Sequence, residues 1–493
     1  MNVWQQDWIS RWALYSPDRI AIFEEESGKS ISYAQLNYKS NGIADYLKNQ
    51  LQVHKGDRIA VIAEFSIEYI CLFGAAQKLG FILVPINYRL AQAEVSDILH
   101  DSSPKMIFAD DKYDHLIDIH FHESKYNYSQ IDSITGSGTT EIKPVSEDDP
   151  IFIIYTSGTT GKAKGVKYTH KMLFWNSINT ALSLKLNTES RTVNVMPPFH
   201  TGGWNVLLTP FLHHGGFVCL CSKFTPERVL AAITNWKCNI FMGVPTMLAM
   251  LANENAFDDA DISCLDYIIV GGESMPIPLI ERYAAKGVAI RQGYGMTEVG
   301  PNLTSLHQDD AIRKKGSIGR PNFYVEHRVI NENGLDAIAN ETGELWLRGP
   351  MVTPGYWQNE SGTKDAFSED GIWFRTGDMV IEDEDKYLYI VDRLKNMYIS
   401  GGENVYPAEV EKVLRQIPSV SECAVVGVKD EKWGEVGRAF IVTAKDQVIA
   451  ESDVRTFCIS KLAKFKIPKY FVFMESLPKT DSGKIDRKSL KFL

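Results

Sequence analysis

Cysteine is scarce in this chain, and its pattern argues against two kinds of stabilising site. Only seven cysteines occur among 493 residues, and no two of them are spaced as CxxC. Structural zinc sites and disulfide frameworks are recognised by such pairs or by an even set of cysteines. We therefore expect neither a zinc site nor a disulfide framework. Reduced thiols of this kind are typical of a cytoplasmic protein.

Long apolar runs and several familiar catalytic motifs are also missing. The runs 81-FILVPI and 151-IFIIY are far shorter than the ~18 apolar residues of a membrane-spanning helix, so no integral membrane segment is expected. Residues 1–14 lack both a basic leader and an apolar stretch, and the chain does not end in a peroxisomal address. HExxH, GxSxG and GxGxxG are absent, which removes the simplest metalloprotease, esterase and dinucleotide-binding interpretations.

Positive charge is in deficit overall but not at the C-terminal end. The chain has 52 Lys and Arg against 62 Asp and Glu, a formal charge of −10. Such an acidic chain argues against a dedicated nucleic-acid binder, which would carry a basic face. Residues 461–493, however, carry +6, so the preceding 460 residues carry −16. This basic segment indicates either that an anion is handled at the C-terminal end or that the surface there is simply rich in solvated lysine.

Short β-rich runs alternate with helical patterns over most of the chain. Runs such as 58-RIAVIAEF, 151-IFIIYTS and 267-YIIVGG are apolar on both faces, which is typical of parallel strands covered by helices on both sides. After about residue 325 short alternating strands predict a β subdomain, and from about 396 a compact α+β unit follows. The predicted fold is α/β: a large domain of αβ-layered sheets with its β subdomain over 1–392, and a small lid domain over 393–493.

A loop rich in glycine and hydroxyl residues follows the strand at 151–156. Glycines let the backbone turn tightly and present N–H groups to an anion, while hydroxyls and lysines add donors and charge. The spacing is not that of a Walker loop. A flexible polar turn is the alternative interpretation. The candidate phosphate-binding residues are Thr156, Ser157, Gly158, Thr159, Thr160, Gly161, Lys162 and Lys164, with Gly165 after them.

The loop resembles the phosphate loop of the acyl-adenylate-forming (AMP-binding) superfamily, which includes acyl-CoA synthetases, 4-coumarate–CoA ligases, luciferases and peptide-synthetase adenylation domains. The family pattern YTSGTTGxPKGV is matched from Tyr155 to Val166 except that Ala163 replaces Pro. Losing that proline frees φ at one position, so we expect a slightly looser grip on phosphate. The resemblance covers nearly the whole chain, and its motifs occur in the family's order.

Further motifs carry the resemblance into a nucleotide site. In 293-GYGMTE, it implies that Tyr294 stacks on adenine, Thr297 bonds the α-phosphate and Glu298 helps to hold Mg²⁺, as suits a hard carboxylate. Asp378 in 376-TGD matches the aspartate that accepts the ribose hydroxyls. The remaining nucleotide-binding residues implied by the resemblance are Gly271, Gly272 and Glu273 in 270-VGGES, Gly295, Met296 and Arg393.

The C-terminal part matches the family's lid. In 478-PKTDSGKIDR, the resemblance implies that Lys484 bridges the carboxylate and the α-phosphate while charge develops on both. The family's hinge position corresponds to Lys395, and 400-SGGEN resembles the segment that lines the pantetheine tunnel. The CoA-binding residues implied are Gly401, Gly402 and Glu403, with the lysines Lys464 and Lys466 near the CoA phosphates.

The class of the carboxylic acid substrate is predicted from the segment 197-PPFHTGGWN. His200 matches a histidine that closes one side of the family's acyl pocket, and Trp204 falls where some bacterial fatty-acyl-CoA synthetases place a gating tryptophan. Gly202, Gly203 and Gly293 add little bulk, so a long tunnel is possible. A medium- or long-chain fatty acid is favoured. An aryl acid stacked on Trp204 is the alternative, and Trp204 is equally compatible with a residue that fills core space.

The resemblance implies an acyl-CoA synthetase that forms an acyl-adenylate from a carboxylic acid and ATP with Mg²⁺, then transfers the acyl group to CoA. Two other enzymatic functions remain as alternatives: an aryl-acid CoA ligase, and a stand-alone adenylation enzyme that loads an acyl or peptidyl carrier protein. A degenerate, non-enzymatic adenylate-binding protein is the third alternative. No nucleic-acid partner is expected.

Overall fold

The structure is a computed structural model that describes residues 7–134, 145–156, 163–271, 275–400, 403–445, 447, 449–459, 461–480 and 483–493. The chain divides into two compact units. The first comprises Met1–His327 and Leu347–Phe374, and the second comprises Arg328–Trp346 and Arg375–Leu493. A division into compact units does not identify a hinge. The domain boundary between residues 392 and 393 and the rotation of the lid domain therefore stay predictions.

The first unit contains a six-stranded sheet in the order β6-β5-β3-β4-β7-β8. Its strands are parallel except β8, which runs antiparallel to β7. Every residue of β4 and β5 is buried, as is typical of parallel strands covered on both faces. The strands are β3 (Arg58–Ile62), β4 (Ile82–Pro85), β5 (Met106–Ala109), β6 (Lys125–Asn127), β7 (Pro150–Thr156) and β8 (Lys164–Thr169).

Two further sheets complete the first unit. One has the order β11-β12-β13-β14-β15, and the other the order β2-β1-β10-β9. The first is formed by β11 (Ile240–Gly243), β12 (Tyr267–Val270), β13 (Ala289–Tyr294), β14 (Thr304–Ser305) and β15 (Arg320–Pro321). The second is formed by β1 (Ile20–Glu24), β2 (Lys29–Ser32), β9 (Arg191–Asn194) and β10 (Phe217–Leu220).

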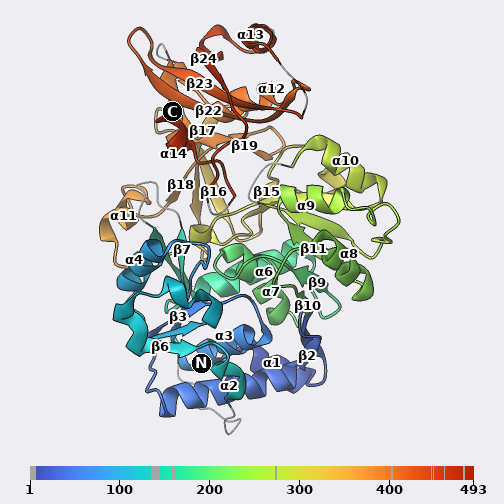
Figure 1. The fold of residues 1–493 in the computed structure, drawn as a ribbon, viewed down its shortest axis with the longest axis vertical. Helices are drawn as coiled ribbons and strands as arrows, with labels where there is room; N and C mark the ends of the chain where they lie inside the picture. Colours follow the sequence, from blue (N-terminus) through green and yellow to red (C-terminus); the bar gives the residue numbers. More distant parts are fainter. Residues whose placement is uncertain are drawn as a thin grey trace. The chain divides into compact units, whose positions relative to one another are not determined.

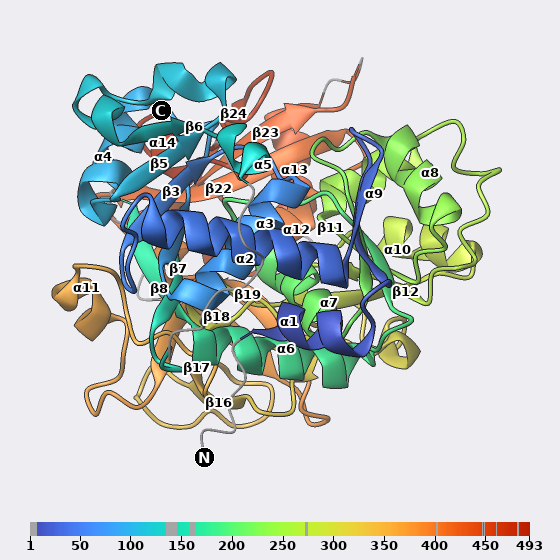
Figure 2. The same ribbon diagram turned by 90° about the horizontal axis from the view of Figure 1, so that it is seen from below.

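Helices pack against these sheets (Figure 1). Helix α3 (Ile67–Leu79) is buried at twelve of its thirteen positions, as expected for a helix enclosed on all sides. Helix α2 (Tyr33–Asn49), whose first turn is closed by a capping box at Ser32, lies beside α3 and α1 (Figure 2). The other helices of this unit are α1 (Trp8–Tyr15), α4 (Gln92–Ser102), α5 (Gln130–Ser133), α6 (His170–Leu184), α7 (Leu208–His213), α8 (Pro226–Asn235), α9 (Pro245–Ala252), α10 (Ile277–Ala285) and α11 (Glu360–Asp365).

The second unit is built on two antiparallel arrangements. The sheet β16-β17-β18-β19 precedes a sheet in the order β21-β20-β23-β22, to which β24 adds by pairing in parallel with β23. Its strands are β16 (Glu326–Ile330), β17 (Thr342–Arg348), β18 (Phe374–Glu382), β19 (Leu388–Arg393), β20 (Tyr398–Ser400), β21 (Glu403–Val405), β22 (Val420–Asp430), β23 (Gly434–Thr443) and β24 (Tyr470–Phe473). Its helices are α12 (Pro407–Leu414), α13 (Glu451–Ile459) and α14 (Arg487–Leu490).

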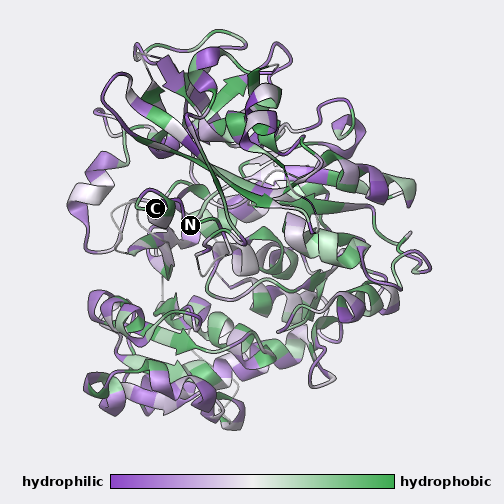
Figure 3. Cartoon of the chain, turned by 45° about the horizontal axis from the view of Figure 1, so that its top comes forward, coloured by the Kyte–Doolittle hydropathy of each residue, from purple (hydrophilic) through white to green (hydrophobic). Residues whose placement is uncertain are grey.

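Apolar residues gather on the strands of both units (Figure 3). In helix α12, Val410 and Leu414 are buried in the core of the second unit. Within the described part of the chain, no helix has the length and apolar character needed to cross a membrane.

Candidate active site

The nucleotide motifs of the first unit follow the carboxyl ends of strands. The loop from residue 157 follows β7, 271-GGES follows β12, and 295-GMTE follows β13. Ligands of open α/β sheets bind at this edge. The parallel register pairs Val270 with Gln292, which brings the next residues of the two strands together. A Cβ on Gly271 would lie 3.8 Å from the carbonyl oxygen of Gly293.

Ten of the predicted site residues lie outside the described part of the chain. They are Ser157, Gly158, Thr159, Thr160, Gly161, Lys162, Gly272, Glu273, Gly401 and Gly402. Their predicted roles stay predictions.

The GYGMTE segment turns sharply after β13. A Cβ on Gly295 would lie 2.1 Å from the carbonyl oxygen of Pro301, so only glycine fits there. The Tyr294 hydroxyl lies 4.0 Å from the sulfur of Met296. Thr297 and Glu298 form a short 3-10 turn and are buried at 8% and 7% exposure. The turn therefore places two consecutive buried polar residues, Thr297 and Glu298, after the end of the strand.

The buried carboxylate of Glu298 has a partner that the sequence did not reveal. The Tyr356 hydroxyl donates to its Oε1 at 3.0 Å, and the ring of Tyr356 lies 4.9 Å from the Nζ of Lys164. Burial and the Glu298 charge raise the pKa of Tyr356, so this phenol stays protonated and donates. In the phosphate-loop strand, Thr156 Oγ1 lies 3.5 Å from the carbonyl oxygen of Lys164.

Trp204 is a core residue that holds the PPFHTGG turn. Its side chain is fully buried, and its Nε1–H donates to the carbonyl oxygen of Pro198 at 2.7 Å. The neighbouring rings belong to Phe65, Tyr69, Phe73 and Phe152, with centroids 4.8 to 5.5 Å from the indole.

The turn itself is tight. The N–H of Gly203 donates to the His200 carbonyl at 3.0 Å, and the Asn194 amide donates to the Gly203 carbonyl at 3.0 Å. A Cβ on Gly203 would lie 2.2 Å from the Pro197 carbonyl oxygen, whereas Gly202 meets only the end of Met196. Close approach therefore requires the second glycine.

A network of side-chain amides connects this segment to the GYGMTE segment. Residues Gly202–Val206 form a π-helical turn, a feature often found at functional sites. The amide of Asn302 donates to the carbonyls of Asn205 at 3.3 Å and Val206 at 2.9 Å, and to Thr180 Oγ1 at 2.6 Å. The amide of Asn176 also donates to the Asn205 carbonyl, at 2.7 Å.

Proline explains why the Val206 carbonyl needs this donor. Four residues after Val206, Pro210 lacks the N–H that would otherwise bond that carbonyl. Pro210 is therefore a signal in the sequence that the Val206 carbonyl needs a donor from elsewhere. It does not identify the residue that supplies this donor.

In the second unit, cations gather around the buried carboxylate of Asp378. Asp378 is 2% exposed and pairs with the Arg393 guanidinium. Burial, followed by the charges of Arg393 and Lys484, lowers the pKa of the Lys395 amine, and Asp378 opposes this. The structure therefore pairs the predicted ribose residue Asp378 with Arg393, and it brings the predicted hinge residue Lys395 within electrostatic influence of both and of Lys484.

The residues predicted to bind CoA are more dispersed. Glu403 is exposed on β21, and Lys466 is held by both oxygens of Glu409 at 2.7 and 2.8 Å, which reduces its capacity to bind phosphate. Lys464 lies in a 3-10 turn beside it.

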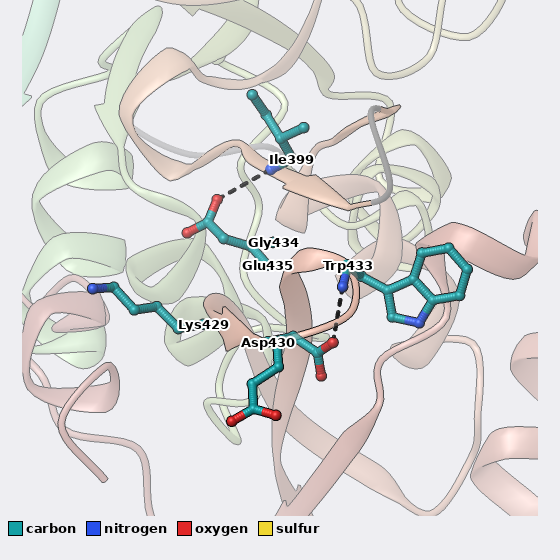
Figure 4. Close-up of a pocket in the computed structure, with 7 residues that line it drawn as sticks. Ile399, Lys429, Asp430, Trp433, Gly434 and Glu435 are labelled. Carbon is teal, nitrogen blue, oxygen red and sulfur yellow. Dashed lines mark hydrogen bonds between the residues drawn. The ribbon is translucent and has the colours of Figure 1, made fainter.

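A pocket of about 610 Å³ lies beside β20, the strand that leads towards residue 401. Trp433 lies at the edge of this pocket (Figure 4). The backbone N–H of Trp433 donates to Asp430 at 3.0 Å, and the backbone N–H of Ile399 donates to Glu435 at 3.1 Å. Sequence reasoning had not found this pocket.

Comparisons with known proteins agree with these features. Residues 9–357 match the AMP-binding enzyme family, and residues 409–484 match the AMP-binding enzyme C-terminal domain. A long-chain-fatty-acid–CoA ligase of Mycobacterium tuberculosis is 36% identical over 483 residues, covering 96% of this chain and 95% of the relative. A feruloyl-CoA synthase of Amycolatopsis is 35% identical over 478 residues, covering 97% and 96%.

A solved structure shares the fold. The o-succinylbenzoate CoA synthetase of Bacillus subtilis, in complex with its acyl-adenylate intermediate, has a TM-score of 0.89 and 31% identity, covering 99% of this chain and 98% of that one. The predicted α/β fold with a large N-terminal and a small C-terminal domain is confirmed. The named relatives act on acids of different classes, so the comparisons do not select one acid.

Proposed function

Because the chain belongs to the AMP-binding enzyme family, we propose that it is an ATP-dependent acyl-CoA synthetase that converts a carboxylic acid to its CoA thioester. The observation that carries this proposal is the pair of charge arrangements built from the predicted residues. In the first unit, Tyr356 contacts both Glu298 and Lys164, and in the second, Arg393 pairs with Asp378 while Lys395 lies within electrostatic influence of Asp378, Arg393 and Lys484.

In the first half-reaction, a carboxylate oxygen of the acid attacks the α-phosphorus of ATP. An acyl-adenylate forms as the bond to pyrophosphate breaks. Lys484 stabilises the charge that develops on the attacking and α-phosphate oxygens, and Thr297 donates to the α-phosphate. Asp378 accepts from the ribose hydroxyls.

The residues present are compatible with Mg²⁺. Glu298 offers a hard carboxylate ligand, and its buried place beside a threonine hydroxyl suits an ion that is shared with phosphates. The ion supplies charge neutralisation at the phosphate oxygens when it is bound. The solved complex of the Bacillus subtilis relative with ATP and magnesium supports this assignment.

In the second half-reaction, the CoA thiolate attacks the acyl carbon and AMP leaves with its electron pair. Rotation about Lys395 would withdraw Lys484 and bring the segment at 401–403 forward. The pocket beside β20 is lined by Ile399, which precedes that segment by two residues in the sequence, and this supports an acceptor approaching from the second unit. The relatives named above are all CoA ligases, so CoA is favoured over a carrier protein.

The burial of Trp204 favours an acid with a compact acyl group over a medium- or long-chain fatty acid, and it removes Trp204 as a stacking surface for an aryl acid. A long chain passing this point would displace an indole that is fully buried and hydrogen-bonded at 2.7 Å. Displacing such a side chain costs about 2–4 kcal/mol from lost burial and the lost hydrogen bond.

A panel of acids tests the function and the acid class together. The purified protein is incubated with Mg-ATP and each acid, pyrophosphate release is measured, and CoA is compared with a phosphopantetheinyl carrier protein as acceptor. We expect release with acids that have a compact acyl group, and a CoA thioester as product. Preference for long fatty acids would overturn the acid class, and transfer only to the carrier would overturn the acceptor. No acid-dependent release with any acid would favour the adenylate-binding alternative.

A further inference from the structure

Tyr356 contacts two residues of the proposed site, although the segment 353-TPGYW received no role from the sequence. Its hydroxyl donates to Oε1 of Glu298 at 3.0 Å, and its ring lies 4.9 Å from the ammonium nitrogen of Lys164. Glu298 follows β13, while Lys164 begins β8 directly after the phosphate loop. One side chain therefore contacts two motifs that are more than 130 residues apart in the sequence.

The backbone on either side of Tyr356 is held against β8. The N–H of Lys167 donates to the Gly355 carbonyl at 3.1 Å, and the N–H of Trp357 donates to the Gly165 carbonyl at 2.7 Å. Tyr356 itself forms a β-bridge with Val166, and its N–H donates to Thr363 Oγ1 at 2.9 Å. The segment thus adds a short antiparallel partner to the strand after the phosphate loop, which restricts movement of the ring.

The same segment also holds the backbone of Glu298. The N–H of Thr353 donates to the Glu298 carbonyl oxygen at 2.7 Å, so the residue is bound at its main chain and at its side chain by one short stretch of chain. Both Glu298 and Tyr356 are buried, at 7% and 8% exposure. A buried carboxylate needs a donor, and the phenol that supplies it at Oε1 also sets the direction in which Oε2 points.

The ring acts on Lys164 in a different way. An ammonium group within about 6 Å of an aromatic centroid is attracted by the ring quadrupole, and the attraction grows where water is excluded. The phenol therefore holds an anion at its hydroxyl end and a cation at its face.

We propose that Tyr356 is a positioning residue that orients the Glu298 carboxylate towards a divalent cation and the Lys164 ammonium towards a nucleotide phosphate. The inference rests on the proposed function, because it assigns Tyr356 to the metal and phosphate side of that same site. The proposal assigns the orientation of Glu298 to the Tyr356 hydroxyl and the orientation of Lys164 to the Tyr356 ring.

The test compares Tyr356→Phe, which keeps the ring and removes the hydroxyl, with Tyr356→Leu, which removes both. Mn²⁺ binding is measured by electron paramagnetic resonance with the α,β-methylene analogue of ATP, and AMP binding is measured by calorimetry without metal. Since a hydrogen bond to a charged group contributes enough for about a tenfold change, Tyr356→Phe should weaken Mn²⁺ binding about tenfold and leave AMP binding unchanged. Tyr356→Leu should, in addition, weaken binding of the metal-free ATP analogue.

Tyr283→Phe is the matched control, because its buried hydroxyl donates at 2.9 Å to the Leu248 carbonyl and it should leave both affinities unchanged. Wild-type Mn²⁺ affinity in Tyr356→Phe, or an equal loss of AMP affinity, would overturn the proposal. If Tyr356→Phe does not fold, Tyr356→Leu tests the loss of the hydroxyl, and wild-type Mn²⁺ affinity there would equally overturn the proposal. A wild-type protein that binds Mn²⁺ and the analogue but releases no pyrophosphate with any acid would refute the proposed function alone.

Discussion

The lysines of the C-terminal part of the chain have different environments in the structure. Lys466 is held by Glu409, and Lys469 by Asp430 at 2.5 Å. The amine of Lys395, by contrast, has its pKa lowered by burial and by the charges of Arg393 and Lys484. The basic C-terminal segment therefore contains ion-paired lysines as well as the one proposed to act on phosphate.

Lys484→Ala should reduce acid-dependent pyrophosphate release by several orders of magnitude, because it removes the one cation proposed to stabilise charge on the attacking carboxylate and α-phosphate oxygens together. Thioester formation from pre-made acyl-adenylate should stay near the wild-type rate. The two half-reactions are measured separately by pyrophosphate release and by thioester chromatography. Lys491→Ala, an exposed lysine of the same segment, is the control for loss of charge. Equal loss in both half-reactions would contradict the role of Lys484.

At the scale of elements, the junction between the π-helical turn Gly202–Val206 and helix α7 contains a backbone carbonyl, that of Val206, which a side chain bonds in place of a helix N–H. Pro210 withholds an N–H from the Val206 carbonyl, and the Asn302 amide takes its place at 2.9 Å. Asn302 lies just after the predicted adenylate motif, so its side chain connects the predicted acyl-pocket segment to the predicted nucleotide turn.

Asn302→Leu should lower the free energy of unfolding by about 1–3 kcal/mol, because it removes the amide that donates to the Val206 carbonyl, whereas the Asn205 carbonyl keeps Asn176 as its donor. The fall is measured by urea denaturation. Asn49→Leu, which removes only an exposed bond to Asp45, should change the free energy of unfolding by less than about 0.5 kcal/mol.

Pro210→Ala gives a direct check of the physical reason for this bond. It restores an N–H four residues after Val206, so in the Asn302→Leu background it should recover part of the lost stability. If the double variant is no more stable than Asn302→Leu, the missing proline N–H is not the reason that the Val206 carbonyl needs Asn302.

At the scale of the whole molecule, one buried and two partly buried histidines make stability depend on pH. Burial lowers the pKa of His170 to about 4 and of His213 to about 3, and it lowers the pKa of His214 as well. His213 stacks on Trp8 with centroids 3.9 Å apart and bonds the Ser177 hydroxyl at 2.8 Å. These groups stay neutral in the folded chain, whereas they protonate near pH 6.5 when unfolded.

Stability should therefore be greatest above about pH 7 and should fall as the pH drops from about 6.5 towards 4, where only the unfolded state takes up protons. The free energy of unfolding in urea should decrease by a few kcal/mol between about pH 7.5 and pH 5. His213→Phe keeps a ring against Trp8 and removes one titration, so its decrease should be smaller. An equal decrease in the variant would exclude His213 as a contributor.

The alternation of apolar runs and helical patterns was enough to predict the fold class. Strands such as β5 and β12, buried at every position, have a local signature that needs no tertiary information. The phosphate loop, GYGMTE and TGD were recognisable because glycine, hydroxyl and carboxylate residues occur there at short, characteristic spacings. Trp204 shows the limit: one position suited a gate, a stacking surface and a core residue, and only its packing against four rings distinguished them.

What the sequence by itself determined about this protein is its family, its α/β class and the order of its motifs, because each of these depends on residues close together in the chain. Only the tertiary structure brought Tyr356 to Glu298 and Lys164, Asn302 to Val206, and Lys484 to the surroundings of Lys395. These partners are distant in sequence, and a tyrosine or asparagine carries no local mark of the group that it will bond. Burial removes water from such groups, and the fold decides which side chain replaces it.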